Sequence, residues 1–133
     1  MPAPPTRPVP DLIGTWRGTS VGEPVTLLVT EQTADAGYSG IFVSADHLLG
    51  PRRQGVSGVL TSTIRGAAVG ARAEGWLGND ASGRLVLLLH AETPDGQQRL
   101  TLAHVGDDQL QGTGEASFRW GPKGPARLTR QPR

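Results

Sequence analysis

The strongest constraint on this 133-residue chain is that its hydrophobic residues recur at every second position and nowhere with a helical period. Segments 25–30, 54–64 and 110–120 show this spacing, and short polar or glycine-rich stretches separate the segments from their neighbours. A period of two is typical of β-strands that bury one face. The chain is therefore expected to be all-β, without an amphipathic helix.

The segments make about eight strands joined by hairpin-sized turns, such as the one from Thr93 to Gly96. Short connections pair sequential strands antiparallel. A sheet that closes on itself has no exposed edges, and glycines inside the strands allow the coiling that a small barrel needs. We predict an up-and-down antiparallel β-barrel of about eight strands, with a two-sheet sandwich as the alternative.

The first strand, expected over 12–19, holds one of three tryptophans and is the candidate for barrel closure. Gly14 has no side chain to hold another backbone away. Trp16 would bury a large ring where the sheet meets itself. We interpret both as structural residues of barrel closure. The alternative is an ordinary core tryptophan on an edge strand.

Composition excludes several classes of protein. With 36% hydrophobic residues and 19 glycines, the chain is expected to form one small, turn-rich domain. Thirteen basic and twelve acidic residues leave a net charge of +1 without a block of like charge, which argues against a nucleic-acid partner. Because there is no cysteine, disulfides and cysteine-based zinc sites are excluded.

Residues 1–11 form a proline-rich leader, with five prolines in the first ten positions. Such a stretch is expected to be a disordered, extended tether, which leaves a single barrel domain over 12–131. No apolar run reaches membrane-spanning length, and no signal peptide is recognisable before the leader. Two localisations stay open: an exported or bacterial-envelope protein whose mature domain begins here, or a cytoplasmic protein.

The Gly-Thr-Trp stretch at 14–16, together with Arg127 or Arg130 on the last strand, resembles a pairing shared by calycins. Calycins are the superfamily of lipocalins, fatty-acid-binding proteins and avidins. In that superfamily an arginine from the last strand covers the tryptophan at the closed end of the barrel. Arg130 shares its strand face with Ala126 and Leu128, the more apolar set, so the resemblance implies this role for Arg130.

Two further stretches resemble avidins: 38–45 is similar to their third strand and 56–60 to their fourth. Where avidins carry a tyrosine in the third strand, this chain has Phe42, which lacks the hydroxyl that would donate to a ureido oxygen. The resemblance therefore implies a lipocalin-like or avidin-like barrel that does not bind biotin.

No catalytic constellation is evident in the sequence. The patterns of a nucleophile elbow, a phosphate loop and a dinucleotide site are absent. His47, His90 and His104 have no metal-ligand spacing, although two facing imidazoles in one hairpin would bind a metal if the register of His90 and His104 allowed it. We predict a non-enzymatic protein without a catalytic residue, a resident metal or a cofactor.

The longest connection places two leucines in a loop, followed by two arginines. If this loop lies over an open barrel mouth, Leu48 and Leu49 would line a ligand entrance with Phe42, and Arg52 and Arg53 would attract an acidic head group. The predicted ligand is small and apolar or amphipathic, such as a fatty acid or an isoprenoid fragment. The alternative is that both leucines pack on the barrel rim or in a dimer contact.

Trp76 shares a strand face with Arg72 and Glu74 if its strand is regular, which would place an aromatic side chain on the polar side of the barrel. An outward tryptophan suggests an interface with a partner or a second copy. A bulge at Gly75 would instead turn the ring inward.

Two functions follow from these expectations. The first is a non-enzymatic binder of a small ligand in or at the mouth of the barrel. The second is an envelope-associated or inhibitor-like protein-interaction module with a filled barrel, whose partner is an envelope protein or a second copy. Lumen volume separates the two. A ligand needs a cavity on the order of several hundred Å³, whereas a filled lumen would be occupied by Phe42, Leu60, Phe118 and Trp120.

Overall fold

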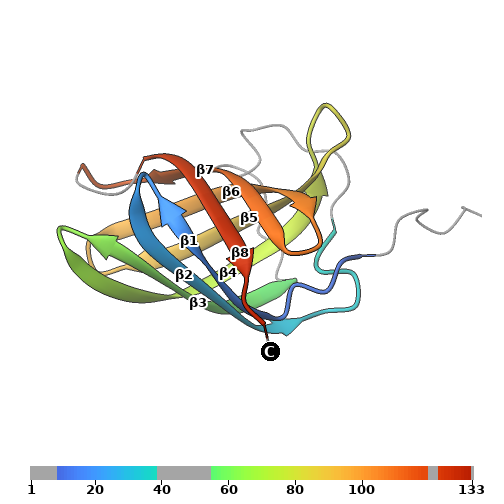
Figure 1. The fold of residues 1–133 in the computed structure, drawn as a ribbon, viewed down its shortest axis with the longest axis horizontal. Coiled ribbons are helices and arrows are strands. Elements are labelled where there is room, and N and C mark those ends of the chain that lie inside the picture. Colours follow the sequence, from blue (N-terminus) through green and yellow to red (C-terminus); the bar gives the residue numbers. More distant parts are fainter. Residues whose placement is uncertain (1–8, 39–54, 120–122, 133) are drawn as a thin grey trace, which may run out of the picture.

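The computed structural model describes residues 9–38, 55–119 and 123–132. Within them, eight strands form a closed barrel in which sequential strands pair antiparallel and the last pairs with the first (Figure 1). The strands are β1 (Gly14–Ser20), β2 (Glu23–Gln32), β3 (Val56–Ile64), β4 (Ala67–Asn79), β5 (Leu85–Thr93), β6 (Gly96–Gly106), β7 (Gln109–Ala116) and β8 (Gly124–Arg130). The predicted all-β, up-and-down barrel is confirmed, and the sandwich alternative is wrong. The described residues contain no helix with the length and hydropathy to cross a membrane.

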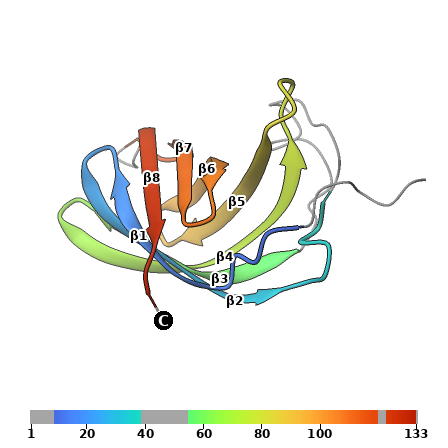
Figure 2. The same cartoon turned by 45° about the vertical axis from the view of Figure 1, so that its right-hand side comes forward.

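The two ends of the barrel are built differently (Figure 2). At one end lie the first residues of β1, the last residues of β8, and the β4–β5 and β6–β7 turns. We call this the Trp16 end. The other end carries the two-residue β1–β2 and β3–β4 turns, and we call it the Val21 end.

Alternation along each strand separates lumen-facing from outward side chains. The lumen-facing set forms the main core cluster, made largely of leucine, with Trp16 at one end. Its largest fully buried members besides Trp16 are Leu12, Leu27, Leu60, Leu77, Leu87, Leu89, Leu102, Leu110 and Leu128. A second, smaller cluster of Ile64, Ala116 and Phe118 lies at the Val21 end.

Trp16 is fully buried and makes one hydrogen bond and one cation–π contact. Its Nε1 donates a hydrogen bond of 2.9 Å to the carbonyl oxygen of Leu12, which satisfies the one polar atom of the indole. The guanidinium carbon of Arg130 lies 4.5 Å from the ring centroid, within the range of a cation–π contact. Arg130 was the arginine expected over this ring. Arg127 is exposed on the outer surface.

Arg130 also joins three separate segments of the chain. Its Nη1 donates to the carbonyl oxygen of Ile13 at 3.0 Å, and its Nη2 donates to the carbonyl oxygens of Asp11 and Asp107. Its Nε lies 3.2 Å from a carboxylate oxygen of Asp108, an ion-pair separation. One side chain thus connects the chain before β1, the β6–β7 turn and the Trp16 ring.

The role expected for Gly14 is right in place but wrong in mechanism. A Cβ built on Gly14 would meet no atom within 4 Å, so no backbone approaches closely there; its φ of +135° is what excludes other residues. The close approach occurs at Gly18, where a Cβ would lie 1.7 Å from the carbonyl oxygen of Arg127. Gly18 therefore lets β1 and β8 come together.

Two predicted strand limits differ from the structure. The strand expected over 38–44 lies outside the described residues except for Tyr38, which is not in a strand, and β2 pairs directly with β3. Residues 56–60 therefore belong to the third strand of this barrel and not to a fourth. Similarly, β7 ends at Ala116 and not near 120, although Phe118 beyond it is still buried.

The end of the proline-rich leader lies against the barrel. The side-chain amide of Gln32 donates to the carbonyl oxygen of Pro10 and accepts from the backbone N–H of Leu12, both at 2.7 Å. Val9 packs against the main core cluster. Gln32, at the end of β2, therefore positions the chain just before it enters β1.

The substitution Trp16→Ala tests whether this ring organises the fold. We expect the free energy of unfolding to fall by about 3–5 kcal/mol, because a large buried aromatic side chain is removed and its hole is only partly refilled. Urea denaturation followed by circular dichroism measures the loss. Trp16→Phe, which keeps a ring under Arg130, should lose less. A loss below about 1 kcal/mol for Trp16→Ala would show that the ring is peripheral.

The substitution Arg130→Lys tests the contacts of Arg130 with the Trp16 ring and with three carbonyl oxygens, which we call the Arg130 clamp. A lysine keeps the charge, but its compact ammonium cannot lie flat on the indole and at the same time donate to carbonyls of two separate segments. We expect a loss of about 2 kcal/mol in the free energy of unfolding. Arg127→Lys, on the outer surface of the same strand, should stay within about 0.5 kcal/mol of the wild type. Equal effects of the two changes would contradict the clamp.

Candidate functional site

The lumen was the first site expected from the sequence, and its middle is filled. Leu27, Leu60 and Leu102, from three different strands, are 1%, 2% and 0% exposed. A lumen open to a ligand would leave such lining side chains accessible. Phe118, one of the side chains expected to fill the lumen, is buried at the Val21 end, whereas Phe42 and Trp120 lie outside the described residues.

A polar layer interrupts the apolar lumen near the Val21 end. Ser20, Ser62 and Gln98 are buried there, and the Ser62 hydroxyl lies 3.2 Å from the side-chain oxygen of Gln98 in a hydrogen bond. None of the three side chains titrates near neutral pH, so the layer has no general acid or base. It is a hydrogen-bonded part of the core.

The five residues predicted to bind a ligand cannot be placed. Phe42, Leu48, Leu49, Arg52 and Arg53 all lie outside the described residues. The ligand entrance that they were expected to form stays a prediction.

Trp76 lies on the outer face of the barrel, as expected for a regular strand, but it is not exposed. The pairing of β4 with both neighbours runs without a register shift through Gly75, so no bulge turns the ring inward. Trp76 is nevertheless only 4% exposed and forms an outer cluster with Val86 and Leu88. Its ring stacks on that of His90, with centroids 6.1 Å apart. It therefore offers no accessible apolar surface.

The register separates the two histidines that were considered as a metal pair. His90 lies opposite Arg99 on the outer face, whereas His104 shares its face with Leu100 and Leu102 toward the lumen. The described residues contain no group of three or more side chains suited to a metal ion. The hypothesis of a metal held between these imidazoles does not fit this register.

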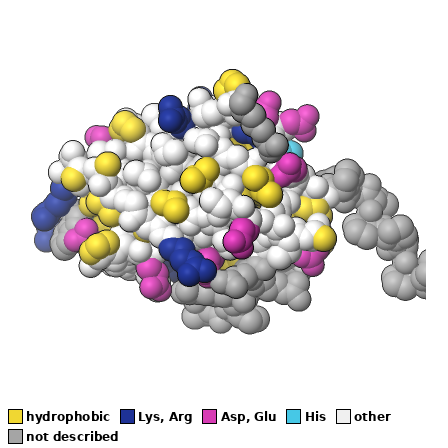
Figure 3. All heavy atoms as spheres, turned by 90° about the horizontal axis from the view of Figure 1, so that it is seen from below, with side chains coloured by type: hydrophobic (Ala, Val, Ile, Leu, Met, Phe, Trp, Pro, Cys, Tyr) yellow, Lys and Arg dark blue, Asp and Glu magenta, His cyan; other side chains and the backbone are white. Residues whose placement is uncertain are grey.

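One exposed part of the outer surface lies over β8, β1, β2 and β3. We call it the threonine wall; its outward residues include Pro125, Arg127 and Thr129, then Thr15, Arg17 and Thr19, then Thr26 and Leu28, and finally Val59, Thr61 and Thr63. Glu31, the partner of Ser57, is the acidic residue at the Trp16 end of the wall. None of these wall residues is aromatic. Figure 3, which views the barrel from below, shows hydrophobic side chains as separate spots among polar ones.

Two features of the wall stand out. Leu28 and Val59 are partners across β2 and β3, and each is 40% exposed, so they form one apolar spot. Arg17 and Arg127 are the basic residues named on the wall, and neither forms an ion pair or side-chain hydrogen bond within the described part of the chain.

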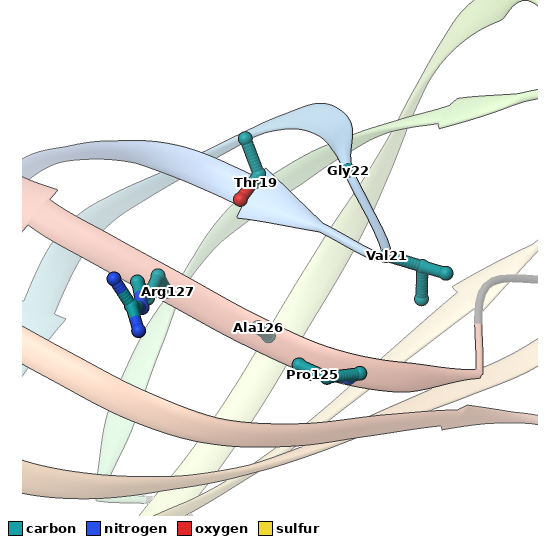
Figure 4. A pocket seen from close by; sticks show the side chains of 6 residues that line it. All are labelled: Thr19, Val21, Gly22, Pro125, Ala126 and Arg127. Atoms are coloured by element: carbon teal, nitrogen blue, oxygen red, sulfur yellow. The ribbon is translucent and has the colours of Figure 1, made fainter.

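A groove of about 330 Å³ opens in the wall at the Val21 end (Figure 4). The strand β1 contributes Thr19, the β1–β2 turn contributes Val21 and Gly22, and β8 contributes Pro125, Ala126 and Arg127. Its walls are thus apolar near the turn and cationic along β8. A smaller groove of about 200 Å³, beside β2 and β3, is lined by Glu31, Gln32, Thr33, Gly55 and Ser57.

The turn beside the groove has an unusual backbone. Val21 has a φ of 53° and Gly22 a φ of 79°, the pattern of a tight hairpin turn in which both central residues are left-handed. A β-branched residue rarely adopts a positive φ because its side chain crowds the backbone. The side chain of Val21 is 46% exposed, and its N–H donates to the carbonyl oxygen of Pro125 at 2.8 Å. This turn was not among the sites expected from the sequence, although Val-Gly between two strands is the signal for it.

His104, on the lumen-facing side of β6, lies close enough to Asp107 and Arg130 for their charges to act on it. Burial lowers the pKa of His104; the nearby carboxylate of Asp107 raises that pKa, and the guanidinium of Arg130 lowers it. Its Nε2 is buried and has no hydrogen-bond partner among the described residues. The neutral imidazole is therefore the form that fits the folded barrel.

Comparisons with protein-family models, with curated proteins and with solved structures found no match to this chain. The calycin resemblance stays a prediction, carried by the Trp16 and Arg130 pairing.

His104 predicts a pH dependence of stability. Because its pKa is lower in the folded state, the unfolded chain binds the proton more readily, and acid favours unfolding. The wild type should keep this contribution above about pH 6.5 and lose it as the pH falls below that value. Urea denaturation between pH 7.5 and 5 should show a shallower pH slope for His104→Gln than for the wild type. Identical slopes would contradict the assignment.

Proposed function

We propose that this protein is a non-enzymatic protein-interaction module that binds its partner on the threonine wall. The observation that carries the proposal is the filled lumen, in which leucines from opposite strands are 0–5% exposed. Binding is then left to the outside of the barrel. The wall supports this role because its outward residues are mostly uncharged: the exceptions are two arginines and, at the Trp16 end, Glu31.

The apolar spot of Leu28 and Val59 suits the centre of such an interface. Interfaces commonly have an apolar centre depleted of charge and a polar, wetter rim. Threonines surround the spot. Thr15 of β1 is the partner of Leu28, and Thr26 and Thr61 form the next outward pair, two residues along β2 and β3. The partner is another protein or a second copy of this chain.

The alternative, a small apolar or amphipathic ligand in the barrel, stays a prediction because its expected residues lie outside the described part of the chain. Decanoate titrated into the protein separates the two functions. We expect no saturable change in tryptophan fluorescence or calorimetric heat up to about 1 mM decanoate. A ligand that buries its alkyl chain in the barrel should saturate the protein below that concentration. Saturable binding would favour the ligand carrier.

The wall is tested with the double variant Leu28→Asp with Val59→Asp. Both side chains are exposed, so the variant should fold, and two desolvated carboxylates at the centre of an interface should weaken binding more than tenfold. Cross-linking in the native cell followed by mass spectrometry identifies the partner, and affinity is then measured with that purified partner. Val105→Asp, an equally exposed apolar position on β6, is the matched control. Unchanged affinity in the double variant would overturn the proposed wall.

A further inference from the structure

We propose that the groove between the β1–β2 turn and β8 binds an extended acidic segment of a protein partner. Two of the segment's carboxylates would pair with Arg127 and Arg17, and an apolar side chain two residues beyond the carboxylate on Arg127 would lie against Val21 and Pro125. This inference rests on the proposed function, since it names the chemistry of the partner at one end of the same wall.

The charge of the groove is uncompensated. Arg127 and Arg17 are both exposed and have no ion pair or side-chain hydrogen bond within the described residues. Arg72 on β4 and Arg130 at the Trp16 end, by contrast, are paired with Glu74 and Asp108. A planar guanidinium binds a carboxylate through two parallel hydrogen bonds, which makes acidic side chains the matching chemistry.

The acidic residues nearest in the fold do not cover the groove. Glu23 follows the turn directly, but it is the partner of Ser20, whose side chain is buried in the lumen, so Glu23 shares the lumen-facing side of the sheet. Glu115 on β7 lies opposite Arg99 of β6. The two guanidiniums on the wall are thus left for a partner.

The spacing of the two arginines fits an extended chain. Thr19 is the partner of Arg127 and Thr129 is the partner of Arg17, so the two arginines are diagonal neighbours across β1 and β8. Diagonal side chains in an antiparallel pair are about 7–8 Å apart. Alternate residues of an extended peptide lie on one face about 7 Å apart. A segment with acidic residues at every second position would therefore reach both guanidiniums at once.

The strained turn supplies the apolar contact. The hydrogen bond from Val21 to Pro125 fixes the turn against β8, and the left-handed backbone holds an exposed valine at the rim of the groove. Asparagine, which adopts this backbone more easily, would be the less strained choice at this position. Residues with a strained backbone are concentrated at binding sites. Here the strain accompanies an exposed valine side chain at the rim of the groove.

The wall favours a peptide over other anionic polymers. Bases and sugar rings are usually held by stacking on aromatic side chains, and none of the wall residues is aromatic. An exposed groove with two surface ion pairs predicts weak binding, in the micromolar to millimolar range, typical of a transient contact.

The test uses a capped heptapeptide with leucine, glutamate and glutamate at positions 2, 4 and 6 and serine at the others, and its counterpart with glutamine in place of glutamate. Each is titrated into the full, ¹⁵N-labelled protein and followed by amide chemical shifts. We expect the acidic peptide to shift the amides of Thr19, Gly22 and Arg127, and the glutamine peptide to bind at least about tenfold more weakly, since it has no charge-assisted hydrogen bonds to make. Shifts that are absent from the groove, or equal for both peptides, would overturn the proposal.

Three variants make the test specific. Arg127→Gln should weaken the acidic peptide about tenfold, whereas Arg72→Gln, an exposed arginine outside the groove, should leave its affinity unchanged. Val21→Asn should raise the free energy of unfolding and yet lower peptide affinity. A purely structural turn would change stability alone, which would overturn the role given to Val21, and an unchanged affinity in Arg127→Gln would overturn the site.

Two outcomes separate this inference from the proposed function. If the acidic peptide shifts no amide of the groove, but the purified partner binds the Leu28→Asp, Val59→Asp double variant more weakly, the wall function stands and the acidic segment is wrong. If decanoate binds saturably and neither surface takes part, both are wrong. An oligogalacturonate that binds the groove more tightly than the acidic peptide would replace the peptide by a polysaccharide and overturn the proposal.

Discussion

The barrel depends on the contact between the Arg130 guanidinium and the Trp16 ring, because this contact joins the last strand to the first. A flat guanidinium can lie on the indole while its N–H groups donate to carbonyls of the chain before β1 and of the β6–β7 turn. Gly18 makes the same seam possible at the level of the backbone, since any side chain there would meet the Arg127 carbonyl. Stacking and close approach together close the sheet.

Closure with eight strands also decides what the interior can do. A barrel of this size has an interior just wide enough for side chains to fill, and here leucines from all around the sheet fill it to within a few per cent of full burial. The buried Ser62 and Gln98 satisfy one another and add no titratable group. The physical chemistry of the lumen is therefore that of a core, which directs attention to the outer surface.

Two parts of the outer surface are unlike. On β4 and β5, outward Trp76, Val86 and Leu88 are buried, so β5 has both faces covered. On β8, β1, β2 and β3, short hydroxyl-bearing side chains leave the sheet exposed, with one apolar spot and two uncompensated arginines. The strained Val21 lies at the edge of this second part. Both proposals place binding there, because it is the region in which exposure, charge and strain coincide.

The sequence by itself determined the architecture and the closing contact. A period of two with glycine-rich turns leaves few ways to bury one face. The resemblance to calycins implied an arginine of the last strand over Trp16, and strand parity chose Arg130, which lies with Ala126 and Leu128 on the lumen side. The alternation of side chains along the strand also predicted that Trp76 points outward. Only the tertiary structure decided that Trp76 is buried there, that His90 and His104 lie on opposite faces, and that Gly18 and not Gly14 admits a neighbouring strand. These properties depend on register and on contacts between distant segments, and a local pattern carries no information about either.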